Sequence, residues 1–138
     1  MSGVYEVAEN VNNHSAILVT SVLTRSEILR AHMPPNAESI LDRFMQRKNV
    51  QEVALDVRMS KLARDIRDHY LPSGVRIKGM DANHLATAII VGVDEFHTFD
   101  GSEESGGRGG LLRFDGNVAG HALRICIPPF QQHRFEGF

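Results

Sequence analysis

The chain has 138 residues, 42% of them hydrophobic, which is enough for one domain with a buried core and too little for two. Its 15 basic and 17 acidic residues leave a formal net charge of −2, so a nucleic acid could be held only by a local basic patch. The single cysteine, Cys126, excludes an intrachain disulfide, and no apolar run reaches the ~20 residues of a membrane span. We therefore expect a single cytoplasmic domain over residues 1–138 with no membrane partner.

Apolar spacing and capping residues predict the elements of the first half of the chain. Residues 16–20 (Ala-Ile-Leu-Val-Thr) form a β-rich run typical of a strand covered on both faces. Thr24 is predicted to cap the next helix, with Glu27 three residues on completing a capping box. The other predicted elements are, in chain order, a helix over 3–13, helices over 25–32 and 37–48, a strand over 50–55, and a helix from Asp56 to Tyr70.

The second half of the chain continues the alternation of helices and strands. Asp81 opens a predicted helix over 82–91 with a small apolar face, and Gly92 is placed to end it. The other predicted elements are strands over 96–99 and 123–127 and, between them, a glycine-rich surface loop over 101–110. This alternation implies an α/β fold with a mostly parallel sheet and helices on both faces.

Three acidic residues fall where parallel α/β sheets place functional groups, at the carboxyl ends of strands and in the loops that follow. Glu27 lies one short turn beyond the first predicted strand, Asp81 lies at a helix start, and Asp100 directly follows its strand. Carboxylates gathered at one sheet edge repel each other, and a hard divalent cation such as Mg²⁺ or Mn²⁺ relieves that repulsion. Each acid alone also has a structural interpretation, as a capping-box partner, an N-cap or a turn former.

Several short motifs follow one another in a defined order. The segment Asp81-Ala-Asn-His-Leu-Ala-Thr-Ala is followed by Thr98-Phe-Asp100, and Thr20-Ser-Val-Leu-Thr-Arg-Ser-Glu27 precedes them. These motifs resemble the third-acid helix, the Thr-x-Asp strand end and the second-acid motif of the PIN-domain family, and the closing Ile125-Cys-Ile-Pro resembles its final strand. The resemblance runs from about residue 15 to residue 129 and implies a three-layer α/β/α fold.

The resemblance also implies a metal-dependent ribonuclease, most often the toxin half of a VapC-type toxin–antitoxin pair. By position, Glu27, Asp81 and Asp100 would be the catalytic ligands of Mg²⁺ or Mn²⁺. Thr98 would hydrogen-bond within the acidic cluster or to a water. RNA would be the substrate, a small antitoxin would bind across the site, and PIN toxins commonly form homodimers.

Basic residues near the three acids are the candidates for contacts with RNA phosphates. Arg25 lies two residues before Glu27, and Arg108 lies in the glycine-rich loop that follows Asp100. Their guanidinium groups suit phosphate oxygens. We rank Arg25 and Arg108 first among the basic residues for this role.

The start of the chain departs from the family pattern, which normally begins with a central strand ending in an aspartate. Nothing before Ile17 is predicted to form such a strand, and residues 1–13 instead resemble the end of the first helix. Three explanations stay open: a start codon assigned too far downstream, a truncated fragment, or a degenerate protein that no longer cleaves RNA. The alternative function is therefore a truncated or degenerate PIN domain that binds RNA or a partner without catalysis.

Other features carry more than one interpretation. His84, one turn into its predicted helix, could border the site or be a half-buried histidine with its own hydrogen bonds. His97 is expected to face the opposite side of the sheet from Thr98, and Cys126 is expected to be a buried structural thiol. The loop over 101–110 could close over RNA, supply a further metal ligand, or be a solvated linker.

Overall fold

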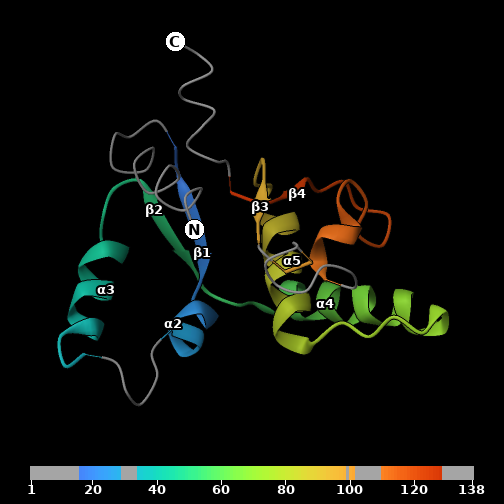
Figure 1. Cartoon of the computed structure of the whole chain (residues 1–138), viewed down its shortest axis with the longest axis horizontal. Coiled ribbons are helices and arrows are strands. Elements are labelled where there is room, and N and C mark those ends of the chain that lie inside the picture. The colour runs from blue at the N-terminus through green and yellow to red at the C-terminus, as the bar shows by residue number, and fades with distance from the viewer. Residues whose placement is uncertain (1–15, 29–33, 99, 102–109, 129–138) are drawn as a thin grey trace, which may run out of the picture.

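The computed structural model describes residues 16–28, 34–98, 100–101 and 110–128 (Figure 1). Its strands are β1 (Leu18–Ser21), β2 (Val50–Val53), β3 (Phe96–His97) and β4 (Ile125–Cys126). Its helices are α2 (Leu23–Ile28), α3 (Ala37–Met45), α4 (Val57–Tyr70) and α5 (Gly79–Val91), with short 3-10 helices η1 (Leu71–Ser73) and η3 (Leu111–Phe114). None of the helices in these ranges combines the length and apolar character that a membrane crossing requires.

The four strands form two parallel pairs (Figure 1). β1 pairs with β2, with Leu18 opposite Val50, and β3 pairs with β4, with His97 opposite Cys126. The predicted α/β class and parallel pairing are therefore confirmed. Within the described ranges no strand joins the two pairs, so the parallel strands lie in two separate sheets. The predicted absence of a central strand concerns the first 15 residues, which lie outside the described part, and stays a prediction.

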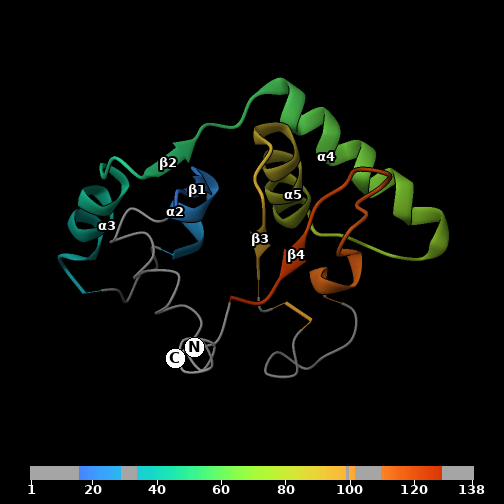
Figure 2. The same cartoon turned by 90° about the horizontal axis from the view of Figure 1, so that it is seen from above.

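The two strand pairs carry different helices. In Figures 1 and 2, α2 and α3 accompany β1–β2, and α4 and α5 accompany β3–β4. The main hydrophobic core belongs to the second group, where α4 packs along α5 and the side chains of Ile66, Leu85 and Ile125 are fully buried. The helix α3 of the first group has no buried residue, and its Ile40 is 50% exposed. The described core therefore supports the half of the chain that contains Asp81.

Two predicted helix boundaries depend on local interactions and are confirmed. The Asp56 carboxylate accepts a hydrogen bond from the Met59 backbone N–H at 2.9 Å and so caps α4. Gly92 ends α5 with a φ of +79°, a left-handed conformation that glycine adopts without steric cost. These ends are encoded within a few residues of the helix that they limit.

Two predicted helix starts are wrong. α2 begins at Leu23, whose N–H donates to Ser21 Oγ at 3.1 Å, so Thr24 lies inside the helix and accepts a hydrogen bond from the Thr20 hydroxyl at 2.9 Å. The predicted capping box between Thr24 and Glu27 therefore does not form. α5 begins at Gly79 after Lys78, which places Asp81 in the first helical turn and frees its carboxylate from the predicted capping role.

Several predicted elements are shorter, or fall outside the described residues. α3 ends at Met45 instead of residue 48, and β3 and β4 keep two residues each. The pairing of β3 with β4 extends by one further hydrogen bond, from the Thr98 N–H to the Cys126 carbonyl at 3.0 Å. The predicted helix over 3–13 and most of the loop over 101–110 lie outside the described part.

Candidate functional site

The three predicted acids come from three separate elements. Glu27 lies in the last turn of α2, Asp81 in the first turn of α5, and Asp100 just beyond β3. The Glu27 carboxylate contacts Nε2 of His84, which lies three residues after Asp81 on α5. This contact joins residues 57 positions apart in sequence and attaches α2 to α5 at the site.

The pKa of Asp81 shows that the acids act on one another. Burial raises this pKa above its ordinary value, and the negative charges of Asp100 and Glu27 raise it further. The positive charge of Lys78 and the His84 ring act in the opposite direction. The acidic cluster, meaning Glu27, Asp81 and Asp100, therefore places two further negative charges near the partly buried carboxylate of Asp81, with Lys78 and His84 opposing them.

The spacing of the acidic cluster is looser than that of a closed metal cage. Among the residues that the structure describes, the only group of three or more His, Cys, Asp or Glu side chains close enough to share one ion is Glu95, His97 and Cys126, and it does not include the acidic cluster. One ion bound by all three acids would therefore need a bridging water or a shift of side chains. The chemistry of the donors nevertheless fits a hard divalent cation, because carboxylate oxygens are its preferred ligands and a cation would offset the negative charges of Asp100 and Glu27 that act on Asp81.

Backbone hydrogen bonds hold Asp100 from both sides. Its N–H donates to Thr98 Oγ1 at 3.0 Å, and its Oδ2 accepts from the Leu111 N–H at 3.3 Å. Its carbonyl accepts from the Leu112 N–H at 3.2 Å. Gly110 packs so closely that an added Cβ would collide with the Asp100 carbonyl. The Thr98 hydroxyl thus positions the backbone of Asp100, and the Leu111 N–H fixes the orientation of its carboxylate.

The first candidate RNA contact, Arg25, is engaged within the protein. Its guanidinium donates to both carboxylate oxygens of Glu52, at 2.5 and 2.9 Å, and to Asp42 at 2.5 Å. These two acids raise the pKa of Arg25 and tie α2 to β2 and α3. A contact with RNA would need Arg25 to leave these partners, and it stays a prediction. The second candidate, Arg108, lies outside the described residues.

Both interpretations of His84 hold, because its side chain is half-buried with a hydrogen-bond partner, and that partner is Glu27 of the acidic cluster. The spacing of His84 from Asp81 is the sequence signal for this position, because residues three apart on a helix share a face. Sequence reasoning missed the acidic partners of Arg25, for which the local sequence holds no signal. Cys126 is half-buried, so the expectation of a buried thiol holds only in part.

Asp81→Asn is expected to raise the melting temperature at neutral pH by a few degrees in the absence of divalent metal. Folding raises the pKa of Asp81, so ionisation of this group destabilises the folded state. The destabilisation is absent below the ordinary carboxyl pKa and complete above the raised one. Thermal unfolding at pH 7 and at about pH 3 should therefore show the gain only at pH 7. Exposed Asp65 provides the control Asp65→Asn, and a lower melting temperature for Asp81→Asn at pH 7 would contradict the raised pKa of Asp81.

Comparison with known proteins places the chain in a family. A family model of the PIN domain matches residues 4–102, well over half of the chain, and the match includes the whole acidic cluster. Neither the curated proteins nor the solved structures contain a match. The matched segment starts earlier and ends earlier than the resemblance noted from the motifs. The chain belongs to the PIN-domain family, which has nuclease-type function and generally uses divalent metal ions.

Proposed function

We propose that the chain is a Mg²⁺- or Mn²⁺-dependent endoribonuclease of the VapC toxin type. The observation that supports this most directly is the acidic cluster, in which Asp100 and Glu27 both raise the pKa of Asp81. Membership of a nuclease family favours phosphodiester hydrolysis as the chemistry of the cluster. A divalent ion held there would lower the pKa of a bound water and stabilise the charge that develops on the phosphate.

Each residue of the proposed site has a defined task. Glu27, Asp81 and Asp100 would hold the ion directly or through water, and His84 would orient the Glu27 carboxylate. The Thr98 hydroxyl keeps Asp100 in place by accepting a hydrogen bond from its backbone N–H. RNA enters against this negative charge, so its phosphates need cations nearby.

Lys78 is better placed than Arg25 to supply such a cation. Its charge acts on Asp81, whereas the guanidinium of Arg25 is bound by Glu52 and Asp42. We therefore propose Lys78 as a phosphate contact beside the acidic cluster. Arg25 would take part only by exchanging an internal carboxylate for a phosphate.

Cleavage of a mixed RNA panel by the full 138-residue chain tests the proposed function. We expect cleavage in Mn²⁺, loss of cleavage when a chelator is added, and recovery when Mn²⁺ is supplied in excess of the chelator. The recovery step separates metal dependence from damage by the chelator. Absence of cleavage by a chain that is folded by circular dichroism would overturn the proposal.

The proposed partners follow from the toxin-type assignment. A small antitoxin would cover the acidic cluster, and two copies of the chain would form a homodimer in the cytoplasm, each copy being one domain over residues 1–138. Size-exclusion chromatography with light scattering measures the mass of the free chain. A monomer at micromolar concentration would contradict the dimer without bearing on the nuclease site.

A second candidate function is a non-catalytic PIN domain that binds RNA or a protein partner. Two observations favour it: the described strands form two separate pairs, and the acids are spaced more widely than the ligands of a closed metal cage. This candidate predicts that the chain binds RNA in a filter-binding assay without cleaving it in Mn²⁺. The same RNA panel therefore decides between the two functions.

A further inference from the structure

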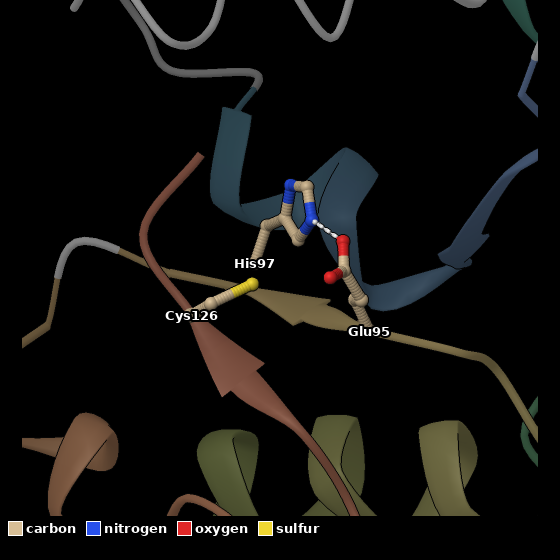
Figure 3. Close-up of side chains that lie close together, drawn as sticks. All are labelled: Glu95, His97 and Cys126. Carbon is tan, nitrogen blue, oxygen red and sulfur yellow. Dashed lines mark hydrogen bonds and ion pairs between the residues drawn. The ribbon is translucent and has the colours of Figure 1, made fainter. Parts of the chain in front are cut away.

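A second group of metal-ligating side chains lies on the β3–β4 pair, on the face opposite the core. His97 and Cys126 are directly opposite each other in the parallel register, and Glu95, two residues before His97, projects from the same face (Figure 3). Phe96 and Ile125 alternate with them and pack with the core. Strand geometry thus gathers a carboxylate, an imidazole and a thiol on one surface, and we call this group the β3–β4 cluster.

The distances within the β3–β4 cluster are close to those of a metal site. His97 Nε2 and Glu95 Oε1 are 3.0 Å apart, and the ligand atoms of all three residues lie within 4.8 Å of one another. Zinc–ligand bonds of about 2.0 to 2.3 Å in a tetrahedron place neighbouring donors roughly 3.3 to 3.7 Å apart. Small side-chain rotations would therefore bring the three donors to the spacing that a tetrahedral ion requires.

The donor types select a different ion from the one expected at the acidic cluster. Thiolate and imidazole are ligands of Zn²⁺, whereas Mg²⁺ prefers oxygen ligands only. Ionised Glu95 and Cys126 would together neutralise the two charges of Zn²⁺. Three protein ligands would leave a fourth position for water or an external donor.

Arg124 contacts two members of the β3–β4 cluster, Glu95 and Cys126, and a metal ion would displace it from the Cys126 thiol. Arg124 pairs with the other oxygen of Glu95, Oε2, at 3.3 Å and is itself 68% exposed, so Oε1 remains directed at His97. The side chains of Glu95 and His97 are 39% and 28% exposed. Burial and the Glu95 charge raise the pKa of the Cys126 thiol, whereas the charge of Arg124 and its hydrogen bond to the thiol act in the opposite direction. Zn²⁺ binding would displace the thiol proton to solvent, because a coordinated thiol is deprotonated.

We propose that Glu95, His97 and Cys126 bind one Zn²⁺ ion per chain at a site separate from the acidic cluster. The ion would cross-link β3 to β4, which have two residues each. Thr98 directly follows His97, and its hydroxyl accepts a hydrogen bond from the Asp100 N–H. The cross-link would therefore also stabilise the strand end that carries Asp100. The site binds metal whether or not the chain cleaves RNA.

Co²⁺ spectroscopy tests the site, because Cys126 is the only cysteine in the chain. Co²⁺ added to the untagged full chain should produce a thiolate-to-cobalt charge-transfer band that saturates at one ion per chain and disappears when one equivalent of Zn²⁺ is added. Cys126→Ser should abolish the band, and His97→Ala should weaken Co²⁺ binding by at least about tenfold. Asp81→Asn should leave the band unchanged, which separates this site from the acidic cluster.

His69→Ala, on α4, is the matched control for His97→Ala and should bind Co²⁺ like the wild type. If Cys126→Ser does not fold, protection of the wild-type thiol from alkylation by Zn²⁺, and loss of that protection in His97→Ala, provides the same test. A wild-type chain without the band would overturn the proposal. So would saturation at half an ion per chain, which places the metal between two copies, or equal Co²⁺ binding by His97→Ala and the wild type.

Discussion

Asp100→Asn is expected to lower Mn²⁺-dependent RNA cleavage by about a hundredfold or more, because it removes one charged ligand of an ion that stabilises the transition state by several kcal/mol. The fold should survive. The asparagine side-chain oxygen can still accept the Leu111 N–H, and the backbone hydrogen bond to Thr98 does not involve the side chain. Initial rates at saturating RNA, with circular dichroism as the test of folding, measure the effect.

The matched control for this variant is Asp94→Asn, which neutralises an exposed acid just before β3. Its cleavage rate should equal that of the wild type. Rates should then be measured across a series of Mn²⁺ concentrations, because partial recovery of Asp100→Asn at high Mn²⁺ would locate the defect in metal affinity. Equal rates for Asp100→Asn and the wild type would remove Asp100 from the site.

Leu85→Ala is expected to destabilise the chain by about 2 to 5 kcal/mol, because it leaves a cavity in a tightly packed core. The Leu85 side chain is 0% exposed, belongs to the core that α5 shares with α4, and directly follows His84 on α5. Small domains have only about 5 to 15 kcal/mol of total stability, so this loss would be a large fraction. Urea unfolding followed by circular dichroism measures it.

The same substitution at Leu71 provides the comparison for Leu85→Ala. Leu71 directly follows α4 and is 50% exposed, so Leu71→Ala should cost far less. Similar losses for the two variants would contradict the assignment of the main core to the α4–α5 interface. A loss of RNA cleavage by Leu85→Ala that parallels the fraction unfolded would show that Leu85 acts through stability alone.

Features of the fold that depend on neighbouring residues could be predicted from the sequence. The Asp56 cap of α4 arises from a hydrogen bond between its side chain and the N–H of a residue three positions later. The end of α5 at Gly92 arises from the freedom of glycine to adopt a positive φ. The alternation of strands and helices, and with it the α/β class, follows from apolar spacing. The acidic motifs were likewise sufficient to suggest the family that the comparison later showed.

The wrong helix starts show where local reasoning fails even at short range. Several side chains near the start of α2 could have capped it, and the helix uses Ser21, while Thr24 is bonded to Thr20. At α5, helical geometry extends back to Gly79 without a side-chain cap, so Asp81 is available to the acidic cluster. Competing caps differ by about 1 kcal/mol or less, and the surrounding packing decides between them.

The sequence by itself determined the strand and helix alternation, the start of α4 at Asp56, the end of α5 at Gly92, and the presence of acids at three element boundaries. Only the tertiary structure decided which residues meet. Arg25 is bound by acids 17 and 27 positions away, Glu27 contacts His84 57 positions away, and His97 lies opposite Cys126 through strand register. These contacts depend on how distant elements pack and on the register of parallel strands. Neither is encoded in the propensity or spacing of any local segment.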